Sequence, residues 1–130
     1  MSDDVSAGLI RALIENMRSS ASDWESLAMI LEFPEGAFNE AHGYLYSPGG
    51  VITAVASDPW AVGPAVDAYT GSRYEPGEAL PLKLLVQFDR TNGAYRMTFE
   101  DTDESRWTAT PRNYKELRED LRPNFADRQD

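Results

Sequence analysis

Apolar residues recur at every third or fourth position near the start of the chain. The residues of this stripe are Val5, Leu9, Ile10, Leu13, Ile14 and Met17. Their spacing predicts an amphipathic helix over residues 4–18. Ser2, Asp3 and Asp4 favour a helix start there, because their side-chain oxygens accept hydrogen bonds from the free backbone amides of the first turn.

The next apolar stretch, WESLAMILEF at 24–33, has no decisive period and fits either a helix or a strand. Pro34, Glu35 and Gly36 follow it, and proline and glycine interrupt regular structure of both kinds. The pattern therefore predicts where this element ends and leaves its type open.

Two later stretches predict β-hairpins. In the first, a short strand at 44–46 and the β-branched run at 51–55 flank the turn residues Ser-Pro-Gly-Gly. In the second, residues 82–89 and 95–100 alternate between apolar and polar, with Leu85 as the exception. Between these two strands lies Asn-Gly, for which we expect a type I′ turn because both residues tolerate a positive φ angle.

Proline and glycine are frequent at 59–81, between the two hairpins. We expect a crossover there with at most a short helix over 62–69, since these residues interrupt long helices. Near the end of the chain, a helix within 111–125 is predicted to begin at Thr110 or Asn113 and to stop before Pro123. Its apolar side consists of Tyr114, Leu117 and Leu121.

These elements predict an α+β fold in a single domain over residues 1–130. A strand meander and a hairpin form an antiparallel sheet, and the N-terminal and C-terminal helices pack on one face of it, because each predicted strand has one apolar face. A closed barrel is the alternative.

Composition narrows the chemistry of the chain. The 130 residues include no Cys and one His, His42, which excludes disulfides, thiolate metal sites, multi-histidine metal sites and serine triads. The first residues carry acids where a signal peptide carries bases, and no apolar run approaches the roughly 20 residues that span a bilayer. We expect a cytoplasmic protein without a membrane segment, without a cofactor and without enzymatic activity.

Acidic residues are unevenly distributed along the chain. The net charge is −10, and no Lys or Arg lies between Arg18 and Arg73, a stretch that holds seven acidic residues. The negative electrostatic field of such a stretch repels the phosphates of nucleic acid and attracts basic proteins. Direct nucleic-acid binding is therefore not expected. The charge alone fits a surface that attracts a basic protein, but it favours the simpler view that the acids only keep the chain soluble.

Residues 100–104 contain four further carboxylates. Asp101-x-Asp103-x-Ser105 resembles the start of a calcium loop, but an EF-hand requires Gly and Glu where the chain has Arg106 and Arg112. A weak site for Mg²⁺ or Ca²⁺ at Asp101 and Asp103 is an alternative to a solvated loop. Overall we expect these acids to face water or a basic partner.

Two of the three tryptophans, Trp107 and Trp60, suggest different roles. Trp107, just after the second hairpin, is expected to be structural, with its ring covering that hairpin. Trp60 follows Asp-Pro in the crossover and is expected to be the exposed anchor of an interface, because aromatic side chains beside charges are frequent at interfaces.

Part of the sequence resembles a known family. The N-terminal helix, DWESLAMILEF, the strand meander and LLVQFDRTNGAYRMTFEDTDESRW look like YezG-type immunity proteins of bacterial polymorphic toxin systems. The pattern F-x-x-x-x-G-x-[YF]-x-x-x-[FY], followed by acids and a tryptophan, is formed here by Phe88, Gly93, Tyr95, Phe99, Asp101 and Trp107. The resemblance implies a non-catalytic cytoplasmic protein that binds and neutralises a cognate toxin domain.

Combined with the charge distribution, the resemblance favours a basic toxin of nuclease type as the partner. The residues that we predict to contact it are Glu32, Glu35, Glu40, Asp58, Trp60, Asp101, Asp103 and Glu104. Two other functions are open. A small-ligand-binding module would show a deep apolar pocket beneath the crossover, and an enzyme would show a buried carboxylate pair.

Overall fold

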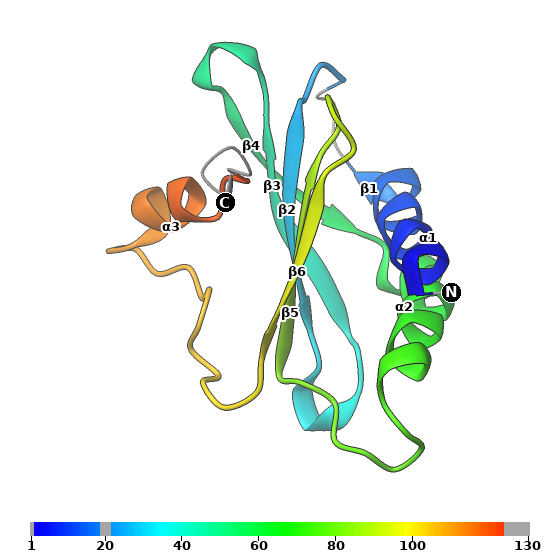
Figure 1. The fold of residues 1–130 in the computed structure, drawn as a ribbon. Coiled ribbons are helices and arrows are strands. Elements are labelled where there is room, and N and C mark those ends of the chain that lie inside the picture. The colour runs from blue at the N-terminus through cyan, green and yellow to red at the C-terminus, as the bar shows by residue number, and fades with distance from the viewer. Residues whose placement is uncertain (1, 19–21, 124–130) are drawn as a thin grey trace, which may run out of the picture.

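The computed structural model describes residues 2–18 and 22–123, and it places them around one antiparallel sheet (Figure 1). The helices and strands are α1 (Ser2–Glu15), β1 (Met17–Arg18), β2 (Ser26–Glu32), β3 (Glu40–Tyr46), β4 (Ile52–Ser57), α2 (Pro59–Arg73), β5 (Lys83–Asp89), β6 (Tyr95–Glu100) and α3 (Tyr114–Asp120). Single 3₁₀ turns, η1 (Pro34–Gly36) and η2 (Pro48–Gly50), follow β2 and β3. The α+β class predicted from the sequence is confirmed.

Strand β2 lies near the middle of the sheet, whose order is β1-β4-β3-β2-β5-β6. The segment that fitted either a helix or a strand is thus a strand, paired with β3 on one side and β5 on the other. Every residue of β2 except Glu32 is buried. A strand covered on both faces reads as a continuous apolar run, which explains why its sequence showed no alternation.

Helices α1 and α2 cover the first face of the sheet (Figure 1). The buried residues of this main core are Leu9, Ile10, Leu13, Trp24, Leu27, Met29, Leu31, Phe33, Ala41, Leu45, Val55, Val62, Val66, Tyr69, Leu84 and Val86. Helix α1 ends at Glu15, earlier than the predicted 18, because Met17 and Arg18 pair with the end of β4. The side chains of residues 2–4, which were predicted to cap this helix, are not among those that the structure describes.

Helix α3 packs on the opposite face, so the prediction that both terminal helices share one face is wrong. Leu117 and Leu121 join a second core with Ile30 and Leu85, and Figure 1 shows α3 across the sheet from α1 and α2. The polar residues of β5 suggested a solvated face. Lys83 and Gln87 are instead buried beneath α3 and the segment before it, and Leu85, the apparent exception, is the apolar contact of that face.

Two side chains of the sheet hold the end of α3 in place. The amide of Gln87 donates a hydrogen bond to the carbonyl oxygen of Leu121 at 2.8 Å. The hydroxyl of Tyr46 donates to the carbonyl oxygen of Arg118. Because the last carbonyls of a helix lack partners within the helix, these bonds stabilise the position of α3. Tyr114, predicted on the apolar side of this helix, is exposed, and residues 124 and 125 of the predicted range lie outside the described residues.

Helix α2 is longer than predicted. A helix of at most 62–69 was expected, but α2 has 15 residues, including Pro64 in its interior. The carboxylate of Asp58 caps it by accepting a hydrogen bond from the backbone N–H of Trp60 at 3.0 Å. Its buried residues are Val62, Val66, Tyr69 and Thr70. Packing of this face on the core compensates for the hydrogen bond that Pro64 removes.

Both predicted hairpins are present, but the turn between β5 and β6 is not type I′. That turn requires a positive φ at Asn92 as well as at Gly93, and of these two only Gly93 is left-handed, with φ +79°. The N–H of Asp89 donates to the carbonyl of Ala94, and the N–H of Gly93 donates to the carbonyl of Asp89. The strands are therefore joined by a longer loop with one left-handed glycine.

Candidate functional site

Acidic side chains gather where β2, β3 and β5 meet the loop at 33–39. Glu32 ends β2 and lies directly opposite Glu40 on β3. The other neighbour of Glu32 is Lys83 on β5. Glu35 lies in η1 with a left-handed backbone, φ +57°, and is exposed. Three of the predicted contact residues are thus brought together by the β2–β3 connection.

A second segment adds an acid to this group. Glu104, from the loop after β6, lines the same hollow of about 310 Å³ as Glu32, Glu35 and Lys83. Glu32 and Glu104 are far apart in the sequence, and the pairing of β2 with β5 and of β5 with β6 brings their segments to one end of the sheet.

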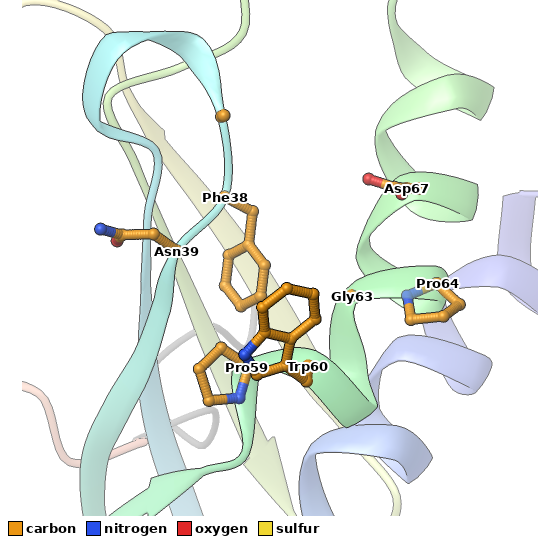
Figure 2. A pocket seen from close by; sticks show the side chains of 8 residues that line it. Phe38, Asn39, Pro59, Trp60, Gly63, Pro64 and Asp67 are labelled. Carbon is orange, nitrogen blue, oxygen red and sulfur yellow. The ribbon is translucent and has the colours of Figure 1, made fainter.

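Trp60 lies on the other side of the loop at 33–39. Its side chain belongs to the first turn of α2 and is 92% exposed, which confirms the predicted exposure. Trp60 and Phe38 line a hollow of about 560 Å³. Figure 2 shows their rings side by side, with Trp60 on α2 and Phe38 on the loop. Asp67 lines the same hollow. It belongs to the stretch between Arg18 and Arg73 that contains no Lys or Arg, which we call the basic-free stretch. The loop therefore lies between an acidic hollow and a mainly apolar one.

We use the name acidic end for the surface formed around this loop. Its residues are Glu32, Glu35, Glu40, Trp60, Asp67 and Glu104. Sequence reasoning missed Asp67 and the neighbouring Phe38, because the position of α2 beside the loop is not a local signal in the sequence.

Three of the residues predicted to contact the partner, Asp58, Asp101 and Asp103, are not part of the acidic end. Asp58 caps α2. Asp103 accepts hydrogen bonds from the backbone N–H and hydroxyl of Ser105, at 2.9 and 2.6 Å, and the bond from the Ser105 hydroxyl contributes most to lowering the pKa of Asp103. Asp101 is exposed in the same loop. In the part of the chain that the structure describes, Asp101 and Asp103 belong to no group of three metal-ligating side chains.

Glu100, directly before this loop, is held by several donors. The guanidinium of Arg106 lies 2.7 Å from its carboxylate, and the backbone amides of Thr102 and Asp103 donate to it at 3.0 Å. The bond from Arg106 is the largest cause that lowers the pKa of Glu100 from 4.5 to about 2. This carboxylate organises the loop after β6.

Lys83 fixes the next part of that loop. Its ammonium is buried and donates hydrogen bonds to the carbonyl oxygen of Arg106 at 2.7 Å and to the hydroxyl of Thr108 at 2.8 Å. Trp107, between these two partners, has a left-handed backbone with φ +62° and packs partly buried against the second core. This packing agrees with the structural role predicted for the ring.

One group of side chains at the acidic end has the composition of a metal site. The Nε2 atom of His42 lies 2.7 Å from a carboxylate oxygen of Glu32. The ligand atoms of Glu32, Glu40 and His42 all lie within 4.8 Å of one another. The sequence prediction assigned these residues no metal, because the chain has a single histidine and a lone histidine is more often a surface residue than a ligand.

No protein-family model matches this chain, and no curated protein is significantly similar to it. None of the helices in the described residues is long and apolar enough to cross a membrane.

Proposed function

We propose that this protein is an inhibitor that binds a basic protein at the acidic end, as the immunity proteins of toxin systems do. The partner in this proposal is a cognate toxin domain of nuclease type. The observation that carries the proposal is the arrangement around the loop at 33–39, where Glu32, Glu35 and Glu104 lie on one side and the exposed ring of Trp60 on the other.

Charge supports a basic partner. Carboxylates at this surface match the Lys and Arg side chains with which a nuclease holds nucleic-acid phosphates, and such pairs form charge-assisted hydrogen bonds. The basic-free stretch supplies most of the acidic end, so few cations of the chain itself compete for these carboxylates. A field of one sign also speeds association with an oppositely charged protein.

Trp60 supports a protein partner rather than a small ion. A tryptophan with 92% of its surface in water costs solubility, and buried tryptophans contribute strongly at the centres of protein interfaces. The mainly apolar hollow beside it offers space for a side chain of the partner. Apolar contact next to charge is the usual composition of such interfaces.

The proposal is tested by co-purification with the C-terminal domain of the protein encoded next to this one, followed by calorimetry. We expect Glu35→Lys and Glu104→Lys each to weaken binding about tenfold or more. Glu116→Lys, an exposed residue of α3, is the matched control, because it changes the net charge equally outside the acidic end. Equal effects of all three variants, or no complex at micromolar concentration, would refute the proposal.

A small-ligand-binding function has one observation in its favour. An apolar hollow of about 440 Å³ lies between α1 and the β5–β6 hairpin, lined by Ile10, Ile14, Phe88 and Tyr95 among others. It lies away from the crossover, where that function was expected to place its pocket. Binding of a hydrophobic dye that Ile14→Glu abolishes would favour this second function.

A further inference from the structure

We propose that Glu32, Glu40 and His42 bind one divalent transition-metal ion, with Zn²⁺ as the best match. This inference goes beyond the proposed function, because it concerns the isolated protein and requires no partner.

The strand register places the three side chains on one face. Glu32 and Glu40 are the last of seven pairs between β2 and β3, and His42 pairs with Ile30 two residues further along. Because side chains alternate across a strand, Glu40 and His42 point to the same face, and Glu32 points there as well. A paired ladder holds their backbone positions, so the three groups are brought together before any ion binds.

The distances between the ligand atoms suit one ion after small rotations. They lie within 4.8 Å of one another, and His42 Nε2 is 2.7 Å from Glu32. A tetrahedral zinc ion with bonds of about 2.0–2.1 Å separates its ligands by about 3.3 Å. Glu40 is exposed, and His42 and Glu32 are only partly buried, so all three side chains have room for shifts of about 1 Å.

The charges at this position call for a cation. Like charges directly opposite each other in a ladder are destabilising, and Glu32 and Glu40 are such a pair. Among the described residues, neither of them forms an ion pair with a Lys or Arg. The neighbouring cation, Lys83, directs its ammonium to Arg106 and Thr108 instead. A divalent ion between the two carboxylates removes this repulsion.

The ligand types select the class of metal. An imidazole nitrogen suits zinc and similar transition metals, whereas Mg²⁺ and Ca²⁺ prefer oxygen ligands alone. His42 is therefore what distinguishes this group from an ordinary acidic surface. Three protein ligands leave a fourth tetrahedral position for water or for a side chain of another molecule.

The test is calorimetric titration of the purified full chain with ZnCl₂, and in parallel with MgCl₂. We expect one Zn²⁺ per chain with micromolar or tighter affinity and at least tenfold weaker binding of Mg²⁺. The chain has one histidine, so the imidazole signals in an NMR spectrum report on this site alone. They are expected to shift in step with zinc binding.

Variants separate this site from the general negative charge. His42→Ala and Glu40→Gln are each expected to weaken zinc binding at least tenfold, while Glu35→Gln, an acid just outside the group, leaves it within twofold. Circular dichroism of each variant verifies the fold. Equal zinc affinity of the wild type and His42→Ala, or imidazole signals that do not respond to zinc, would overturn the proposal. Neither outcome bears on partner binding, which is measured without zinc.

Discussion

At the scale of single residues, Lys83 shows how a charge is accommodated inside this protein. Its strand neighbours are Glu32 and Glu100, and its buried ammonium reaches a backbone carbonyl and the hydroxyl of Thr108. A buried charge is tolerated when hydrogen bonds and opposite charges surround it. In the sequence this lysine only looked like one polar position of an alternating strand.

Lys83→Met is expected to lower the free energy of unfolding by about 1–3 kcal/mol, because it leaves two hydrogen-bond acceptors without their donor. Denaturant titration measures the change. Lys115→Met is the control, since Lys115 is exposed on α3. An equally small effect of both substitutions would contradict the role given to Lys83.

Glu100 gives a prediction about pH. Its pKa in the folded protein is about 2, below its ordinary value of 4.5. Because the folded-state pKa is lowered, the stabilisation is fully present above about pH 4.5 and is lost as the pH falls through about 2. We expect an NMR titration to show this low pKa and Arg106→Gln to raise it. A wild-type pKa near 4.5 would contradict the hydrogen bonds described for Glu100.

At the scale of elements, close contact between β3 and β2 requires a glycine. A Cβ atom placed on Gly43 would lie 1.8 Å from the carbonyl oxygen of Ala28 and 2.9 Å from the Cα atom of Met29. Backbone atoms in a central strand pair have little freedom to move away. By contrast, a Cβ atom on Gly71, in α2, would have no neighbour within 4 Å.

Gly43→Ala is therefore expected to destabilise the protein by about 2 kcal/mol or more. Gly71→Ala, the matched control, is expected to stabilise it by about 0.5–1 kcal/mol, because alanine favours a helix over glycine. Thermal or denaturant unfolding compares the two variants. Similar stability of Gly43→Ala and the wild type would show that β2 and β3 do not approach as closely as described.

The sequence predicted some elements better than others, for physical reasons. The hairpins were predictable because alternation and turn residues are local signals. The length of helix α2 was underestimated because Pro64 and Gly71 disfavour a helix. The buried residues Val62, Val66 and Tyr69 nevertheless have helical spacing. The side on which α3 packs was not predictable, because burial of Lys83 and Gln87 depends on hydrogen bonds to distant segments.

At the scale of the whole molecule, the acidic end is assembled from separate segments. Glu32, Glu35 and Glu40 were predictable as a group, since they flank one loop. Glu104 joins them through the pairing of three strands, and Asp67 through the position of α2 beside the loop. Neither link is visible in local sequence patterns. Asp58, Asp101 and Asp103 were predicted as contact residues because of their charge. Asp58 and Asp103 instead accept hydrogen bonds from backbone amides two residues further along the chain.

The central proposal, electrostatic recognition at the acidic end, is tested most directly by the rate constant for association with the proposed toxin partner, measured as a function of salt. Opposite charges accelerate association at low salt, and added salt screens them. We expect the wild-type rate to fall at least tenfold between about 50 and 500 mM salt. A Glu35→Lys, Glu104→Lys double variant should show a much weaker dependence. A wild-type rate that does not change with salt would contradict the proposal.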